Sequence, residues 1–129
     1  MRPTGRGRVT RAPPRITLAH TDLSVSRLCY GTNMLGWSID QDRSNAILDT
    51  FAELGGNFID TARSYGDWMP DAPKGASERA IGAWLKGRNR EDFVIATKGG
   101  HFDMRAGDYR NRVNPADIGS DLDESLDHL

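Results

Sequence analysis

Residues 56–66 read Gly-Asn-Phe-Ile-Asp-Thr-Ala-Arg-Ser-Tyr-Gly, and the short run of residues 57–60 within them ends in the carboxylate of Asp60. The residues before it, 42–54, place apolar side chains at spacings near 3.6, which predicts a helix. The predicted stripe of this helix consists of Ala46, Ile47, Phe51 and Leu54. Asp42 is a candidate N-cap and Gly55-Gly56 a candidate end, so the residues 57–60 that follow are a predicted strand.

The same unit recurs along the chain. Residues 77–86 form a predicted helix with Ser77 as a candidate cap, and Phe93 to Ala96 is a nearly continuous apolar run typical of a buried strand. A third helix is predicted from Asn114-Pro115, a cap followed by proline at the first helical position. Its predicted apolar side carries Ile118, Leu122, Leu126 and Leu129. Residues 16–32 have an extended pattern, a hairpin followed by a strand from Arg27 to Thr32.

Strands that alternate with helices indicate an α/β fold with parallel strands and right-handed crossovers. An open doubly wound sheet and a barrel both satisfy this order. Residues 1–15 differ, with five arginines, several prolines and glycines, and no acidic or aromatic residue. We predict a disordered basic tail there, with a nucleic-acid-binding arm as the alternative.

The composition describes an ordinary globular chain: 129 residues, 27% of them charged, with a formal net charge of -1. Such a balance excludes a global basic field for nucleic acid, and we expect no nucleic-acid partner. The apolar runs are shorter than a membrane helix needs, so no membrane partner is expected either. The single cysteine, Cys29, is consistent with a reducing compartment, and we expect a cytoplasmic protein.

Three polar side chains stand near the ends of predicted strands. Asp60 ends one strand, Lys98 follows another, and Tyr65 lies in the loop after Asp60. Because parallel strands end at one edge, we expect these side chains to gather there. A nearby ammonium lowers the pKa of a tyrosine, which makes a general acid suited to carbonyl reduction. Taken singly, each residue also has a structural interpretation as a turn cap, a solvated strand end or a packing residue.

Four stretches resemble the aldo-keto reductase family in order and spacing. Residues 56–66 resemble the signature around the catalytic Asp and Tyr, and Ser77-Glu78-Arg79-Ala80-Ile81-Gly82 is similar to the helix that follows it. Val94-Ile95-Ala96-Thr97-Lys98 is similar to the strand that ends in the catalytic Lys. Residues 23–32 resemble the N-terminal hairpin and first strand. The resemblance runs from about residue 16 to residue 129.

The resemblance implies a (β/α)₈ TIM barrel, of which this chain has about three βα units and the hairpin. It implies reduction of an aldehyde or ketone by NADPH or NADH, with no metal. In this scheme Tyr65 donates the proton, Lys98 lowers the pKa of Tyr65, and Asp60 pairs with Lys98. Gly31, Thr32 and Asp60 are the implied cofactor contacts.

Two features depart from the family pattern. Residues 67–76 lengthen the loop after Tyr65, and Trp68 with Met69 is either a wall of the substrate pocket or part of a loop folded on the surface. The family's fourth catalytic residue is a histidine at the end of the strand after residue 129. We assign no catalytic role to His20, His101 or His128.

We therefore predict an N-terminal portion of a barrel, residues 16–129, that is inactive by itself. The alternative is a non-catalytic, truncated aldo-keto reductase-like protein with an interaction or regulatory role, and an unrelated α/β binding domain is a third possibility. The expected partner is a small-molecule carbonyl compound. The substrate, the choice between NADPH and NADH and the oligomeric state are left open.

Overall fold

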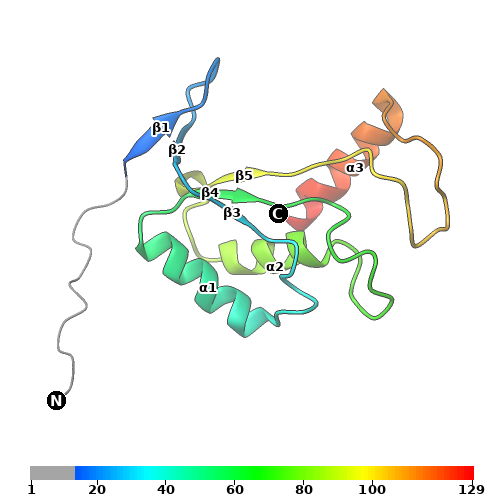
Figure 1. Cartoon of the computed structure of the whole chain (residues 1–129), viewed down its shortest axis with the longest axis horizontal. Helices are drawn as coiled ribbons and strands as arrows, with labels where there is room; N and C mark the ends of the chain where they lie inside the picture. Colours follow the sequence, from blue (N-terminus) through cyan, green and yellow to red (C-terminus); the bar gives the residue numbers. More distant parts are fainter. Residues whose placement is uncertain (1–13) are drawn as a thin grey trace.

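Three short parallel strands, β3 (Cys29–Gly31), β4 (Phe58–Asp60) and β5 (Val94–Ala96), lie at the centre of the molecule (Figure 1). The computed structural model describes residues 14–129. The sheet order is β3-β4-β5, so β4 is central and each neighbour pairs with it in parallel. This arrangement confirms the alternation of strands and helices predicted from the sequence.

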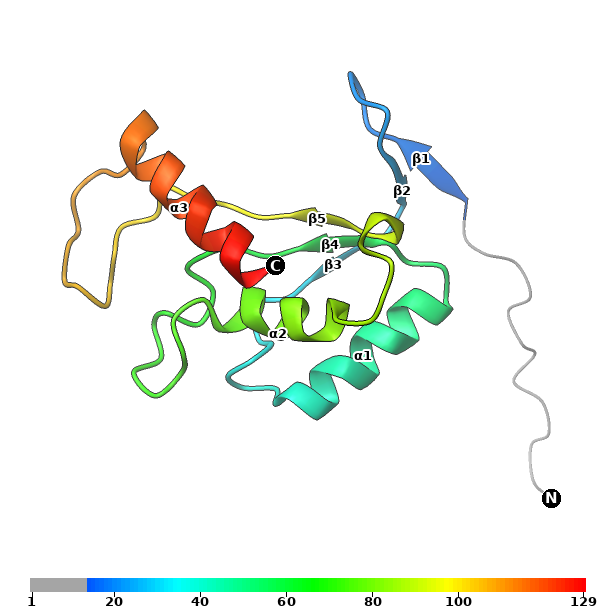
Figure 2. The ribbon, with the colours of Figure 1, turned by 180° about the vertical axis from the view of Figure 1, so that it is seen from behind.

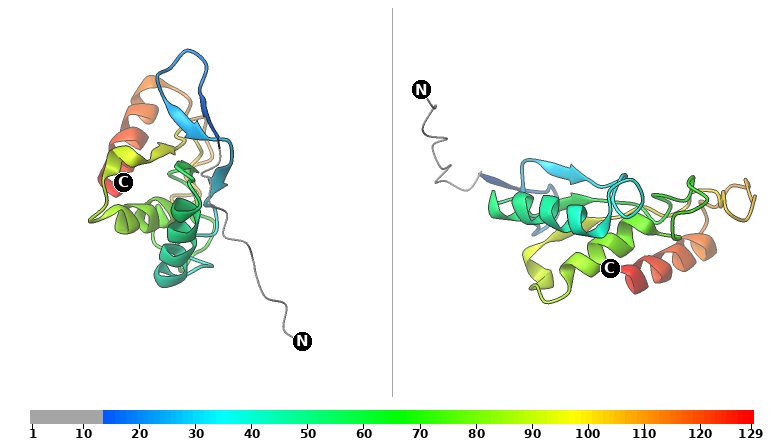
Figure 3. Two further views of the ribbon diagram at one scale, coloured as in Figure 1. Left: turned by 90° about the vertical axis from the view of Figure 1, so that its left-hand side faces the viewer. Right: turned by 90° about the horizontal axis from the view of Figure 1, so that it is seen from below.

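Two helices, α1 (Gln41–Glu53) and α2 (Ala76–Leu85), cover one face of this sheet, as Figure 2 shows from behind. The buried core between them and the strands consists of Leu35, Leu48, Phe51, Ile59, Ala80, Ile81, Trp84 and Leu85. The third helix, α3 (Pro115–His128), packs against α2, and the view from below in Figure 3 shows α2 between α1 and α3.

The strand register decides which side chains face this core. Tyr30, Ile59 and Ile95 are aligned across the three strands and pack toward the helices. Because side chains alternate along a strand, the next row, Gly31, Asp60 and Ala96, faces the other way. The carboxylate of Asp60 therefore stands between two of the smallest residues on the face that the helices leave open.

An antiparallel hairpin of β1 (Arg15–Thr17) and β2 (Ser24–Ser26) lies at the amino ends of the parallel strands. Asn57 attaches it, because its side chain accepts from the Ser26 N–H at 2.6 Å and donates to the Ser24 carbonyl at 3.0 Å. Arg15 pairs with Ser26 in this hairpin, so the predicted tail was wrong at that residue. Residues 1–13 of the predicted tail lie outside the described residues.

Two predicted helix caps were wrong by two residues. Helix α1 is capped by Asp40, whose carboxylate accepts from the Arg43 N–H at 2.9 Å, so Asp42 lies in the first turn. Helix α2 starts after Gly75, which has a left-handed φ of 65° and no side-chain cap. Ser77 does not cap, because its hydroxyl bonds to Thr32 and Thr61 inside the protein. The cap at Asn114, followed by Pro115, is confirmed.

The predicted apolar stripes differ from the buried faces of α1 and α3. In α1 the buried residues are Ser44, Leu48 and Phe51, whereas Ala46 and Leu54 are exposed. In α3 the buried residues are Asp121 and Ser125, and the predicted apolar residues Ile118, Leu122 and Leu126 are exposed. Helix α3 is therefore attached to the described part of the chain mainly through polar side chains.

Candidate active site

The carboxyl ends of β4 and β5 bring three predicted residues together. The Lys98 Nζ lies 2.8 and 2.7 Å from the two carboxylate oxygens of Asp60 and 3.1 Å from the Tyr65 hydroxyl oxygen. The Tyr65 hydroxyl is 3.5 Å from Asp60 Oδ2, a long contact. The expected convergence of the three side chains is thus observed, while their catalytic roles stay predictions.

The Lys98 ammonium has a partner for each of its three N–H bonds. Besides Asp60 and Tyr65, it donates to the main-chain carbonyl of Thr61 at 2.8 Å. Burial lowers the pKa of Lys98, but the hydrogen bonds and charges of Asp60 and Tyr65 outweigh it, so the pKa of Lys98 is raised. Lys98 is therefore held as a cation beside the Tyr65 hydroxyl oxygen.

One aromatic ring, that of Trp68, packs against Tyr65. The Trp68 ring packs edge-on against Tyr65, with centroids 6.2 Å apart, and against Trp37, with centroids 5.9 Å apart. Trp68 is 41% exposed, so it lies beside the site and still faces solvent. A cavity of about 510 Å³ adjoins it, lined by Asp67, Trp68, Pro70, Met104, Arg105 and Tyr109.

The predicted cofactor contacts are placed differently from one another. Gly31 pairs with Asp60 in the sheet, and a Cβ added to it would meet no atom within 4 Å, so its surface is open. Thr32 is buried, and its hydroxyl lies 2.8 Å from the Asp60 carbonyl and 2.7 Å from the Ser77 hydroxyl. The Thr32 hydroxyl thus links the end of β3 to β4 and α2 through hydrogen bonds. Its contact with a cofactor stays a prediction.

The histidines lie apart from this chemistry. His101 is exposed and its ring nitrogen contacts the carbonyl of Phe102 at 2.8 Å. His20 has a φ of 63° in the hairpin turn. His128, near the end of α3, packs its ring against Gly75, where an added Cβ would lie 2.4 Å from the ring. Together with its left-handed φ, this close approach explains why position 75 is a glycine.

A buried pair behind the site was not predicted from the sequence. Glu78 is 0% exposed and contacts the ring nitrogen of His128 at 2.9 Å. Its other carboxylate oxygen accepts from the Thr97 hydroxyl at 2.6 Å. Thr97 precedes Lys98, so this carboxylate links α2, α3 and the segment that carries the ammonium. The one signal in the sequence is that the charged Glu78 lies one helical turn before Ile81, on the side of α2 that also carries Trp84 and Leu85.

The comparisons with known proteins identify the family. Residues 27–129 match the Aldo/keto reductase family model. The chain belongs to the aldo/keto reductase family. A solved aldo-keto reductase from Bacillus halodurans, in its holo form, superposes with a TM-score of 0.74 at 32% identity, over 91% of this chain and 36% of that one.

Curated relatives differ in how much of their length this chain covers. It is 41% identical over 92 residues to a norsolorinic acid reductase of Aspergillus flavus, which covers 65% of this chain and 22% of that protein. It is 37% identical over 92 residues to an uncharacterized 11.2 kDa protein of Pseudescherichia vulneris, over 70% of this chain and 88% of that one. Over residues 14–129, no helix combines the length and apolar character of a membrane span.

Proposed function

We propose that residues 16–129 are the N-terminal portion of a (β/α)₈ barrel oxidoreductase that reduces an aldehyde or ketone with NADPH or NADH. The three parallel strands with helices on one face support this assignment, because the first βα units of such a barrel would have this arrangement. Family membership supports the reaction class. The chain spans less than a quarter of the norsolorinic acid reductase, so the activity of a complete protein is part of this proposal.

One observation carries the proposal: the hydrogen-bond contacts of the Tyr65 hydroxyl oxygen with Lys98 and Asp60. All three Lys98 N–H bonds are used, one of them on the Tyr65 hydroxyl oxygen. Since that oxygen accepts from Lys98, its own proton is the one left to donate, and its contact with Asp60 is long at 3.5 Å. A substrate carbonyl placed near the hydroxyl can therefore take this proton. The ammonium next to it stabilises the phenolate that remains.

The residues of the open sheet face fit a flat cofactor ring. Gly31 leaves its surface free, and Asp60, aligned with it, is partly exposed at the same edge. These two residues would border a bound nicotinamide, which supplies the hydride for the carbonyl carbon. Asp60 also holds Lys98 in place, so it contributes to both cofactor contact and proton donation.

Trp68 is the proposed substrate contact. Its ring packs against Tyr65 and remains half exposed, which favours the pocket-wall interpretation of the long loop. A carbonyl compound that reaches the Tyr65 hydroxyl would pass this ring. Stacking of an apolar or aromatic substrate against tryptophan stabilises such a complex by about 1 kcal/mol.

The test is Tyr65→Phe in a complete barrel that carries residues 16–129. Loss of a general acid should lower the rate of carbonyl reduction by about 10²-fold or more. The matched control is Tyr30→Phe, because Tyr30 packs toward the helices, on the opposite face of the sheet from Asp60. Equal rates for Tyr65→Phe and the control would show that another group donates the proton.

A non-catalytic interaction or regulatory role is the second candidate. The observation in its favour is the short Pseudescherichia vulneris relative, most of whose length this chain covers. Titration with NADPH of the complete barrel that carries residues 16–129 separates the two roles, since a complete protein that binds no dinucleotide would have kept only the scaffold.

A further inference from the structure

Arg63 is the largest fully buried side chain of the described residues and lies between Asp60 and Tyr65 in sequence. Its side chain is 1% exposed. A guanidinium is almost never buried unless it is paired, because leaving water is costly for a charge. The site chemistry above does not use this side chain, so its burial needs its own explanation.

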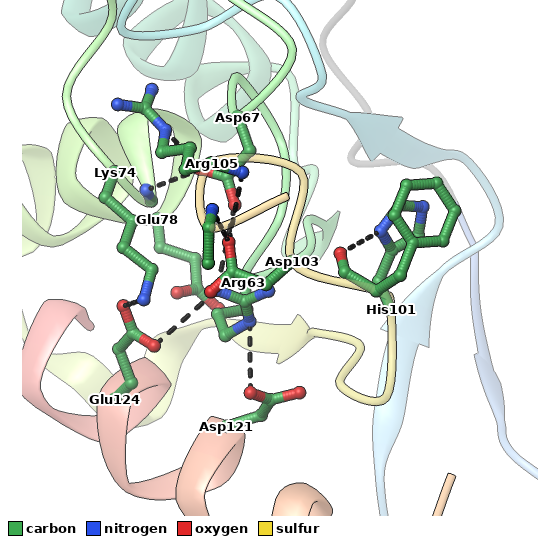
Figure 4. A network of polar contacts seen from close by, with 12 residues as sticks. Arg63, Asp67, Lys74, Glu78, His101, Asp103, Arg105, Asp121 and Glu124 are labelled. Carbon is green, nitrogen blue, oxygen red and sulfur yellow. Dashed lines mark hydrogen bonds and ion pairs between the residues drawn. The ribbon is translucent and has the colours of Figure 1, made fainter. Parts of the chain in front are cut away.

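The guanidinium of Arg63 faces three carboxylates, as Figure 4 shows. Asp121 and Glu124 of α3 lie 3.2 and 3.6 Å from it, and Asp67 of its own loop lies 3.7 Å away. Two of its nitrogens, Nε and Nη2, have no hydrogen-bond partner within the described part of the chain. Arg63 is thus held mainly by charge.

Each of these carboxylates is also paired with a second cation. Asp121 contacts Arg112 and accepts from the Gly100 N–H, and Glu124 contacts Lys74 at 3.1 Å. Asp67 contacts Arg105 at 3.3 Å. The network therefore joins the loop after β4, the loop after β5 and α3, and the side chain of Arg63 lies where the three segments meet.

The main chain of Arg63 is tied to the site at the same point. Its N–H donates to the Lys98 carbonyl at 3.2 Å, and Tyr65 follows two residues later. The Tyr65 N–H donates to the Ala62 carbonyl, so residues 62–65 form one turn. A displacement of Arg63 would consequently move Tyr65 relative to Lys98.

We propose that Arg63 is a positioning residue: its charge contacts with Asp121 and Glu124 hold the Tyr65 loop against α3 and keep the Tyr65 hydroxyl beside Lys98. This inference rests on the proposed function of the Tyr65–Lys98 pair. It also explains why the buried face of α3 is polar, since that face receives the guanidinium.

The experiment observes Tyr65 directly in the purified chain labelled with ¹³C at tyrosine Cζ. The chain has three tyrosines, and Tyr→Phe variants assign their signals. The Cζ chemical shift responds to hydrogen bonds and charge at the hydroxyl. Lys98→Met defines the Tyr65 signal without the ammonium, and Tyr30, which packs on Phe51 in the core, reports whether the fold is intact.

We expect Arg63→Gln to move the Tyr65 signal at least halfway toward its position in Lys98→Met, with Tyr30 unchanged. Arg63→Lys, which keeps the charge, should move it less. Arg110→Gln, the matched control, removes an arginine that pairs with Asp108 and Asp117 on the surface and should leave Tyr65 in place. If Arg63→Gln also displaces Tyr30, Glu124→Gln is the milder variant, with the same direction expected for Tyr65.

An unmoved Tyr65 signal in a folded Arg63→Gln or Glu124→Gln chain would overturn the positioning role. A parent signal that already coincides with that of Lys98→Met would overturn it too, because the chain then holds no Tyr65–Lys98 contact. In that case the proposed function also loses its basis. Movement in Lys98→Met alone leaves the function standing and removes only the role of Arg63.

Discussion

Removal of the His128 ring should destabilise the chain strongly because it leaves a buried carboxylate short of a partner. Glu78 is 0% exposed, His128 is 4% exposed, and the two side chains meet at 2.9 Å. A hydrogen bond to a charged group is worth about 1.5–3 kcal/mol, and an uncompensated buried charge costs about 3–5 kcal/mol. We expect His128→Ala to lower the free energy of unfolding by about 3 kcal/mol.

A double-mutant cycle isolates the contact itself. Glu78→Gln keeps the shape and the Thr97 partner, so it should cost about 1–2 kcal/mol. The double variant should cost less than the sum, with a coupling energy of about 2 kcal/mol, because the second change removes an interaction that is already lost. His101→Ala, at an exposed site, is the control and should stay within about 0.5 kcal/mol of the parent.

Urea unfolding followed by tryptophan fluorescence measures these values, since Trp84 is a buried residue of α2, the helix that also carries Glu78. The contact would represent a large share of the stability of a domain, which is typically about 5–15 kcal/mol. Strictly additive single and double variants would refute the reasoning. That outcome would mean that the pair is no more stable than the separate groups in water.

Three further outcomes are expected. Because the pKa of Lys98 is raised above its ordinary 10.5, the Lys98–Asp60 contact should stabilise the fold fully below pH 10.5 and lose its effect as the pH rises through the higher folded value. Urea unfolding of the parent and Lys98→Met at pH 8 and above pH 11 measures this loss. In a complete barrel, Trp68→Ala should raise KM by about fivefold with a smaller change in kcat, as steady-state kinetics would reveal. Residues 1–129 alone should not oxidise NADPH with an aldehyde, because β3 and β5 are edge strands in the described sheet and a barrel takes about 250 residues to close. Absorbance at the NADPH band tests this, and steady oxidation by a monomer would contradict it.

Much of the fold followed from local patterns. Glycines and a proline mark the helix ends, and short apolar runs mark the strands, so the elements were located to within a few residues. The caps of α1 and α2 were misplaced because several polar residues compete for one position. Asp40 and Asp42 are both aspartates near the start of α1, so the sequence does not distinguish them. In the structure Asp40 has an extended backbone and caps the helix, and Asp42 lies in the first turn.

The buried faces of helices were harder to predict because they depend on distant residues. Periodicity correctly groups Ile118, Leu122 and Leu126 on one side of α3, but it does not say whether that side is buried. The buried side is the one that carries Asp121, because Asp121 pairs with Arg63, a residue far away in sequence. Asp60, Tyr65 and Lys98 could be predicted since parallel strands end at one edge, whereas the Glu78–His128 contact joins residues with no such shared rule.

The polar attachment of α3 changes which of its positions resist mutation. In an ordinary amphipathic helix the apolar side resists change and the polar side accepts it. Here the buried Asp121 must match the position and charge of its arginine partners. Variation accumulating in this helix would therefore preserve the acidic side that receives Arg63.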